Sequence, residues 1–267
     1  MFFGMRPLII LKLGGSVITD KKSAEPKANL EAICRLAKEV AEAYASGKFD
    51  LIIVHGAGSF GHGIVKRTGI DKGLKCGEHL VAFAEVQRLQ NVLNAIVTQE
   101  LIAAGVPAMP CQASSHAVME NGRIIKLETD AIKGLVLKGM VPVLYGVPAY
   151  DTIQGCSILS GDQIAPYVAK KLSAIKIIHG TNVDGICTAD PNTDKSAKQV
   201  PLITKENIES VKKMLSGSAT TDVTGGMAGK VQELADIGIE SQITSALVPG
   251  RIKAALLGER VGTMVEA

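Results

Sequence analysis

The chain has 267 residues, 46% of them hydrophobic and 21% charged, which is enough to bury the core of one large or two small domains. A formal net charge of +3, 3% aromatic residues and no Trp argue against a nucleic-acid partner, because such proteins use basic stripes and stacking aromatic rings. The five cysteines form no C-x-x-C pair, so we expect reduced thiols in a cytoplasmic protein rather than a zinc or redox site. The apolar run near the N-terminus is too short to cross a bilayer, and no membrane partner is expected.

Short apolar runs alternate with segments of helical periodicity along the chain. In chain order we predict a strand at 7–13, a helix at 29–47, a strand at 51–54, a long helix at 78–104, a strand at 140–145 that leads into a Gly-Val-Pro turn, a helix at 162–172, a strand at 175–179, helices at 206–215 and 229–237, and a strand at 241–244. This alternation indicates an α/β fold with a mainly parallel sheet covered on both faces. A seam at 146–160 would separate an N-terminal half, 1–150, from a C-terminal half, 151–267, on one continuous sheet.

Four glycine-rich segments follow predicted strands or open predicted helices, and in open α/β sheets ligands bind at such places. The first, KLGGS at 12–16, puts Lys12 inside a strand, where a buried ammonium group is costly unless an anion pairs with it. An edge strand whose lysine reaches solvent is the alternative interpretation. The second, HGAGSFGH at 55–62, follows the strand at 51–54, and its glycines allow backbone N–H groups to approach an anion closely.

The other two segments lie in the C-terminal half. TNVDGICTADP at 181–191 follows a strand, although its Asp-Gly and Asp-Pro pairs are also ordinary turn chemistry. TGGMAGK at 224–230 opens a helix and ends in Lys230, but its spacing is not that of a P-loop. Each segment alone is weak evidence, yet together they predict a site for two phosphate-bearing ligands. Such ligands repel each other, so the site must neutralise both and hold them in line.

Five motifs occur along the chain in the order found in the amino acid kinase superfamily: KLGGS, HGAGSFGH, SGDQI at 160–164, TNVDGICTADP and TGGMAGK. The chain resembles this superfamily over nearly its whole length, and His62 with the SGD and TGGMAGK motifs makes it most similar to the isopentenyl phosphate kinase family. The resemblance implies a three-layer αβα sandwich with a mainly parallel open sheet, assembled as a homodimer. It also implies that ATP, with Mg²⁺, phosphorylates isopentenyl phosphate to isopentenyl diphosphate, a step of isoprenoid biosynthesis.

The resemblance further implies roles for individual residues. The catalytic set would be Lys12, Lys21, His62 and Lys230, with Lys21 stabilising the charge of the transferring phosphoryl group. The ATP site would comprise Lys12, Gly14, Gly15, Ser16, Gly58, Asp184, Gly226 and Lys230. The acceptor would contact Ala57, Gly58, His62 and Gly161, its phosphate wrapped by the glycine-rich backbone and bonded by the imidazole. Asp162 would order the lysines, and no side chain is assigned as a metal ligand.

The apolar tail of such an acceptor should meet apolar side chains. The helix at 78–104 carries an apolar stripe, and such stripes more often pack in the core, but Ala82, Phe83 and Val86 would suit a small pocket for the tail. The remaining histidines carry no motif and are expected to be structural: His55, His79, His116 and His179.

Three residues depart from the isopentenyl phosphate kinase pattern. Val147 follows Gly146 where an acidic residue is expected, and Cys156 and Cys187 stand where aromatic residues are expected. These positions bear on how the substrate fits rather than on phosphate handling, and tolerance for dimethylallyl or longer prenyl phosphates stays open.

Two other functions remain as alternatives. A fosfomycin-type phosphonate kinase, whose loop also carries a histidine, is the nearest other kinase, whereas uridylate and glutamate kinases fit less well because their acceptor loops lack GSFGH. A nucleotide-binding regulatory protein of the same fold is the non-enzymatic alternative. The joint presence of Lys12, Lys21, His62 and Lys230 argues against it.

Overall fold

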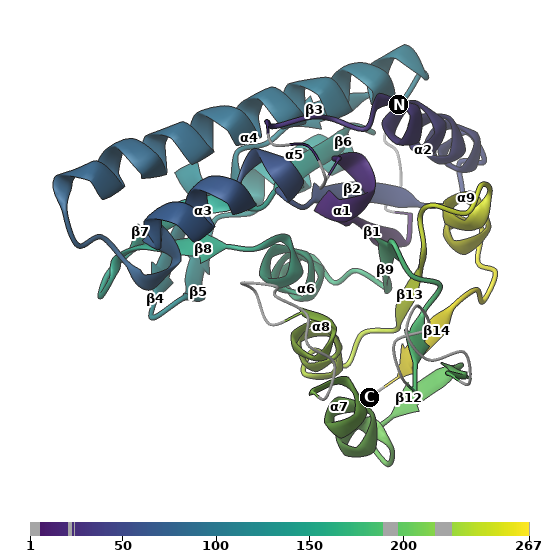
Figure 1. Ribbon diagram of the computed structural model, residues 1–267. Coiled ribbons are helices and arrows are strands. Elements are labelled where there is room, and N and C mark those ends of the chain that lie inside the picture. The colour runs from purple at the N-terminus through teal and green to yellow at the C-terminus, as the bar shows by residue number, and fades with distance from the viewer. Residues whose placement is uncertain (1–5, 21–22, 24, 189–196, 217–225, 267) are drawn as a thin grey trace.

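The central sheet of the described residues has eight strands. The computed structural model describes residues 6–20, 23, 25–188, 197–216 and 226–266 (Figure 1). Across the sheet the order is β12 (Leu202–Thr204), β14 (Thr263–Glu266), β13 (Ser241–Ser245), β9 (Lys176–Thr181), β1 (Leu8–Leu13), β2 (Asp50–His55), β6 (Val141–Tyr145) and β3 (Ala108–Pro110). Among these strands β13 and β14 form the one antiparallel pair. The predicted α/β fold with a mainly parallel sheet is therefore confirmed.

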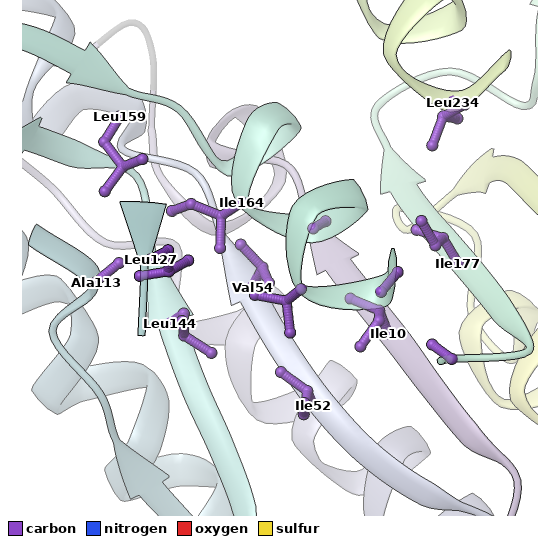
Figure 2. Close-up of a cluster of buried hydrophobic side chains, with 14 of the residues drawn as sticks. Ile10, Ile52, Val54, Ala113, Leu127, Leu144, Leu159, Ile164, Ile177 and Leu234 are labelled. Carbon is purple, nitrogen blue, oxygen red and sulfur yellow. The ribbon is translucent and has the colours of Figure 1, made fainter. Parts of the chain in front are cut away.

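Helices cover both faces of this sheet. One face carries α1 (Gly15–Ile18), α2 (Leu30–Tyr44), α4 (Gly77–Ala103) and α9 (Arg251–Leu256), and the other carries α5 (Asp130–Leu137), α6 (Gly161–Lys171), α7 (Ile208–Ser216) and α8 (Gly226–Ala235). Successive side chains of a strand point to opposite faces. Ile9 and Leu11 of β1 therefore join the core cluster that includes α2, whereas Ile10 joins the cluster that includes Ile164 of α6 (Figure 2). The two clusters lie on opposite faces of the sheet. The sheet and the helices packed on each face therefore form the three layers of the predicted αβα sandwich.

A smaller four-stranded sheet flanks the central one. Its order is β5 (Arg123–Leu127), β4 (Ala117–Glu120), β7 (Val147–Asp151) and β8 (Gly155–Leu159). The buried Asp151 carboxylate ties its two turns together by accepting hydrogen bonds from the backbone of Asn121, Gly122, Ile153 and Gln154 and from the Ser157 hydroxyl. Burial raises the pKa of Asp151, but these hydrogen bonds outweigh it and hold that pKa well below its usual range.

The remaining elements are short. They are α3 (His62–Thr68), the two-stranded pair β10 (Ile186–Cys187) and β11 (Gln199–Val200), and the 3₁₀ helices η1 (Gly58–Phe60), η2 (Ile70–Lys72) and η3 (Ala113–Ser115). Of these, η1 and α3 follow β2 directly and carry the glycine-rich loop that the sequence singles out.

The predicted strands and helices agree with the structure to within a few residues, but the predicted Gly-Val-Pro turn after β6 is wrong. Val147 and Pro148 instead begin β7. Pro148 pairs with Ile158 of β8, whereas the described pairing of β7 with β4 is at Asp151. Within the described residues, no strand pairs with Pro148 on the β4 side, which suits a residue without an N–H. The segment 146–160 therefore contains a β-hairpin, and strands from both halves of the chain build the central sheet.

Candidate active site

Three parallel strands of the central sheet end side by side, and the loops that follow them form the candidate site. Lys12 of β1 is in register with Val54 of β2 and with His179 of β9, so these three side chains share one face of the sheet. The helices α6 and α8 pack on that face. Residues far apart in the sequence meet here because each crossover returns the chain to the same edge of the sheet.

Two lysines and one aspartate meet at the start of α6. The Nζ atoms of Lys12 and Lys230 lie 2.9 Å and 2.5 Å from the same oxygen, Oδ1 of Asp162. Asp162 is held in the first turn of α6, where the Ser160 hydroxyl caps the helix by accepting a hydrogen bond from the Gln163 backbone at 3.3 Å. Both lysines are buried, with 6% and 8% of their surface exposed. We refer to Lys12, Asp162 and Lys230 as the Lys–Asp–Lys cluster.

The cluster carries one more positive charge than negative charge. Burial raises the pKa of Asp162, but the two ammonium groups outweigh it and hold that pKa well below its usual range. Burial and the neighbouring Lys12 lower the pKa of Lys230 against the attraction of Asp162. A buried surplus of positive charge is costly, and an anionic ligand such as a phosphate group offsets it. The arrangement is thus suited to binding phosphate.

His179 lies against this cluster. Its ring is fully buried, and Nδ1 is 3.6 Å from Asp162 Oδ1, which is too far for a hydrogen bond. Neither ring nitrogen has a hydrogen-bond partner within the described part of the chain. Burial and the charge of Lys230 hold the pKa of His179 well below its usual value, so the ring is neutral. The sequence predicts only a structural role for this histidine, because nothing in KIIHGT reveals that the neighbouring strand carries Lys12.

The loops after β1 and β2 touch each other through glycines. A Cβ atom at Gly15 would collide with the backbone of Gly58, and one at Gly58 would collide with the Thr19 hydroxyl. Gly58 also has a φ of +51°, which residues with a side chain rarely adopt. Thr19 Oγ1 joins the two loops by donating to Gly15 O at 2.7 Å and accepting from Ser59 N at 3.0 Å. Loop packing is therefore a reason for these glycines that the sequence did not reveal.

The predicted ATP-site residues of β1 and β9 lie at neighbouring strand ends. The backbone N–H of Gly14 donates to Gly180 O at 2.8 Å, which fastens the loop of β1 to β9. Ser16 Oγ contacts the Asn182 side chain at 3.4 Å. Asp184 follows β9, and its Oδ2 accepts from Arg251 Nη2 at 2.8 Å. Asp184 is thus ion-paired outside the Lys–Asp–Lys cluster.

Two predicted glycines begin the helices that carry the charged cluster. Gly161 opens α6 and Gly226 opens α8. A Cβ atom at Gly161 would lie 3.5 Å from Lys12 Cε, so this position lies directly against the cluster. Lys21 lies outside the described residues, and its role stays a prediction.

The predicted acceptor loop runs from β2 into α3. Along it come Ala57 as the residue before η1, Gly58 as the first residue of η1, and an exposed His62 at the start of α3. His55 at the end of β2 is buried, with Nδ1 3.2 Å from Gly56 O and Nε2 3.0 Å from Asn94 Nδ2. Burial lowers the pKa of His55 to about 4, so the neutral ring donates at Nδ1 and accepts at Nε2. These bonds agree with a structural role for His55.

Ala82 and Val86 lie on α4 next to this loop. Both are buried in a small apolar cluster with residues of α3 and η2, separate from the two main core clusters. Val86 Cγ1 lies 3.6 Å from the position of a Cβ atom at Gly61, one residue before His62. Phe83 is half-buried on the same helix. The structure therefore places Ala82 and Val86 of the predicted tail residues beside the predicted acceptor loop.

A cleft of about 270 Å³ opens beside the Lys–Asp–Lys cluster, at the small end of the range for ligand pockets. Its lining includes Asp162, Gly229 and Glu233 of α6 and α8, and Arg123 at the start of β5. Arg123 donates to both carboxylate oxygens of Glu233, one of them at 3.0 Å. This pair joins the small sheet to the helix that carries Lys230.

The described residues contain no group of three or more His, Cys, Asp or Glu side chains arranged to hold a metal ion. In the same part of the chain, no helix combines the length and the apolar character needed to cross a bilayer.

The sequence and the fold are similar to those of known kinases. A model of the Amino acid kinase family matches residues 7–248. The isopentenyl phosphate kinase of Methanothermobacter thermautotrophicus is 40% identical, over 97% of this chain and 98% of its own length. That of Methanocaldococcus jannaschii is 35% identical over 97% and 98%. An X-ray structure of isopentenyl phosphate kinase superposes with a TM-score of 0.84 at 36% identity and covers 97% of this chain and 99% of its own.

Proposed function

Because the chain belongs to the amino acid kinase family, we propose that it transfers a phosphoryl group from ATP to isopentenyl phosphate and so forms isopentenyl diphosphate for isoprenoid biosynthesis. The observation that carries this proposal is the Lys–Asp–Lys cluster, whose surplus positive charge lies where open α/β sheets bind ligands. The similarity to isopentenyl phosphate kinases along nearly the whole chain supports the choice of acceptor. No observation favours a phosphonate acceptor or a purely regulatory role.

In the proposed reaction, an oxygen of the acceptor phosphate attacks the γ-phosphorus of ATP. A bond forms between that oxygen and phosphorus, the bond from phosphorus to the β–γ bridging oxygen breaks, and ADP leaves with the electron pair. The attacking phosphate is already ionised near neutral pH, so no strong general base is required. The chain's part is to hold both phosphates in line and to offset the charge on the phosphoryl oxygens.

We assign the electrostatic role to Lys12 and Lys230. Asp162 holds both ammonium groups on one oxygen, so the two cations are already gathered at one point before the phosphates arrive. Lys21 keeps its predicted role at the transferring group. Mg²⁺, bound mainly by phosphate oxygens, would neutralise further negative charge.

The acceptor phosphate is proposed to bind the loop after β2. It would contact Ala57, Gly58, His62 and Gly161, while the nucleotide would contact Gly14, Gly15, Ser16, Gly58, Asp184 and Gly226. We propose that residues 1–150 bind chiefly the acceptor and residues 151–267 chiefly the nucleotide, although contacts to each substrate come from both halves. The small apolar cluster at Ala82 and Val86 supports a tail pocket at this end of α4, with Phe83 beside it.

We further propose that the protein acts as a cytoplasmic homodimer, which the resemblance to isopentenyl phosphate kinases supports. Sedimentation equilibrium of the purified protein should give twice the mass of one chain. A mass equal to one chain at micromolar concentration would contradict the dimer.

The proposed function is tested by ADP release with ATP and Mg²⁺ across a panel of acceptors. The panel contains isopentenyl phosphate, fosfomycin, UMP and glutamate, each assayed with the wild-type protein and with His62→Ala. We expect turnover with isopentenyl phosphate alone, and a loss of at least about tenfold in kcat/KM in the variant, because His62 would donate a charge-assisted hydrogen bond. Turnover confined to another acceptor would overturn the substrate, and ATP binding without any turnover would favour a regulatory protein.

A further inference from the structure

The most conspicuous polar group that the proposed function leaves without a role is His179. It lies in the centre of the large sheet, in register with Lys12 and fully buried. Buried imidazole nitrogens are normally hydrogen-bonded, since an unpaired one loses its bonds to water without replacement. Within the described residues both nitrogens of His179 are unpaired, so its presence in the interior requires an explanation.

The carboxylate beside the ring already accepts two other donors. Asp162 Oδ1 accepts the ammonium groups of Lys230 and Lys12 at 2.5 Å and 2.9 Å, whereas His179 Nδ1 stands 3.6 Å from it. A neutral N–H is a weaker partner for a carboxylate than an ammonium group. While both lysines contact Asp162, His179 therefore makes no hydrogen bond to this carboxylate.

A bound phosphate would compete with Asp162 for the ammonium groups of Lys12 and Lys230. An ammonium group that turns toward a phosphate lengthens or breaks its bond to Asp162 Oδ1. The oxygen then needs another donor, because a buried carboxylate that loses a hydrogen bond is destabilised. The His179 ring can supply this donor, because its Nδ1 lies 3.6 Å from Asp162 Oδ1. A small shift of either side chain would bring the two atoms to a normal hydrogen-bond distance.

We propose that His179 is a positioning residue whose Nδ1–H donates a hydrogen bond to Asp162 Oδ1 when a lysine of the Lys–Asp–Lys cluster turns to a bound phosphate. Because the ring is neutral, it keeps the carboxylate oriented without adding a charge. A neutral donor leaves the surplus positive charge of the two lysines available to the phosphates. A third cation would instead repel the ammonium groups of Lys12 and Lys230. The inference rests on the proposed function only in taking ATP as the ligand.

The direct test is ¹⁵N NMR of the imidazole rings in the full-length protein. The chain contains five histidines, and a spectrum of His179→Asn assigns the missing ring. On saturation of the wild-type protein with Mg²⁺ and a non-hydrolysable ATP analogue, we expect the His179 Nδ1–H signal to move downfield. A His179 ring whose nitrogens do not respond to the nucleotide would overturn the proposal.

Kinetics of two matched variants separate positioning from packing. In His179→Asn the side-chain amide offers a donor near the position of Nδ1, whereas His179→Leu has a similar volume and no donor. We expect kcat to fall about ten- to a hundredfold in the leucine variant, the value of a hydrogen bond to a charged group, with KM for ATP changed less than about threefold. The asparagine variant should recover most of that loss. Equal losses in both variants, in proportion to their lowered melting temperatures, would mean that the ring only fills space.

The two experiments also separate this inference from the proposed function. An Nδ1–H signal that responds to the nucleotide in a protein that phosphorylates no isopentenyl phosphate would support the role of His179 and overturn the acceptor. Phosphorylation of isopentenyl phosphate with an unresponsive ring would do the reverse. If His179→Leu fails to fold, the NMR measurement on the wild-type protein still decides the question.

Discussion

At the scale of single residues, the site depends on one oxygen atom. Asp162 Oδ1 is shared by two buried ammonium groups that lie on β1 and α8, and no other carboxylate oxygen in the described chain pairs with either lysine. Sharing one oxygen brings the two cations closer together than like charges would otherwise come. Such closeness is useful when both must face the oxygens of adjacent phosphate groups.

Replacing Asp162 with Asn should therefore destabilise the fold as well as the site. The change leaves two buried ammonium groups without an anion, and breaking a buried pair from one side typically costs about 3–5 kcal/mol. Urea unfolding near pH 7 measures the loss. The matched control is Glu85→Gln, which removes an exposed ion pair with Arg88 on α4 and should leave the unfolding midpoint unchanged.

The effect of Asp162 should also depend on pH in one direction. Its folded-state pKa lies below its unfolded value, so its contribution to stability is present above about pH 4 and is lost as the pH falls further. The difference in unfolding free energy between the wild type and Asp162→Asn should shrink below about pH 4. A difference that stays constant from pH 7 to pH 3 would contradict the ionised buried carboxylate.

Buried histidines should add a second pH dependence above that range. His55 has a pKa of about 4 in the folded protein and about 6.5 when unfolded. Between these values the unfolded chain binds the proton and the folded chain does not, so stability rises with pH up to about 6.5. We expect His55 alone to raise the unfolding free energy by about 1–3 kcal/mol from pH 5 to pH 7. A flatter slope in His55→Asn, with the wild-type slope kept in the exposed control His116→Asn, would support this reading; identical slopes in all three proteins would refute it.

At the scale of elements, the two loops that are predicted to bind phosphate are held together by packing. Gly15 and Gly58 let the backbones after β1 and β2 approach each other, and Thr19 bonds to both loops. The position of the acceptor loop is therefore coupled to the position of the loop that begins with Lys12 and Gly14. A substitution that displaces one loop should therefore also displace the other.

Gly58→Ala tests this coupling. The new Cβ would collide with Thr19 and Gly15, and φ at this position is positive, so we expect a loss of about 2 kcal/mol or more in unfolding free energy and a raised KM for both substrates. Gly63→Ala is the matched control, because a Cβ there has open space inside α3 and should stabilise the helix by up to about 1 kcal/mol. Equal stability of the two variants in urea would show that the loops do not constrain each other.

The elements also show what could be predicted from the sequence. Runs such as Leu8–Leu13 and Lys176–Thr181 are buried strands between helices, and apolar runs with turn signals at their ends predict such strands well. The β4–β5 and β7–β8 hairpins were missed, because Arg123–Leu127 is mostly exposed or half-buried and because Val147-Pro148 reads as a turn. Strand pairing is a long-range property, so KIIHGT could not reveal that His179 lies beside Lys12. The resemblance to the kinase family implies that Asp162 orders the two lysines. Only the structure shows that both ammonium groups contact the same carboxylate oxygen.

At the scale of the whole molecule, the central sheet unites the two halves of the chain. β1 lies between β2 and β9, so the strand that carries Lys12 has the predicted acceptor loop on one side and predicted nucleotide residues on the other. The α8 helix then brings Lys230 back to the same point from the far end of the chain. The small sheet closes against α8 through Arg123 and Glu233. The architecture therefore gathers the charged groups of both halves at one edge of one sheet.

The measurement that tests this account most directly is transfer of label from ATP carrying γ-³²P to isopentenyl phosphate, with the wild-type protein and Lys230→Met in parallel. We expect labelled isopentenyl diphosphate from the wild type and a rate at least about a hundredfold lower from the variant, because a cation at the transferring group is lost. Circular dichroism and nucleotide binding of the variant establish that it is folded. Label that never reaches isopentenyl phosphate, or equal rates for the two proteins, would contradict the account.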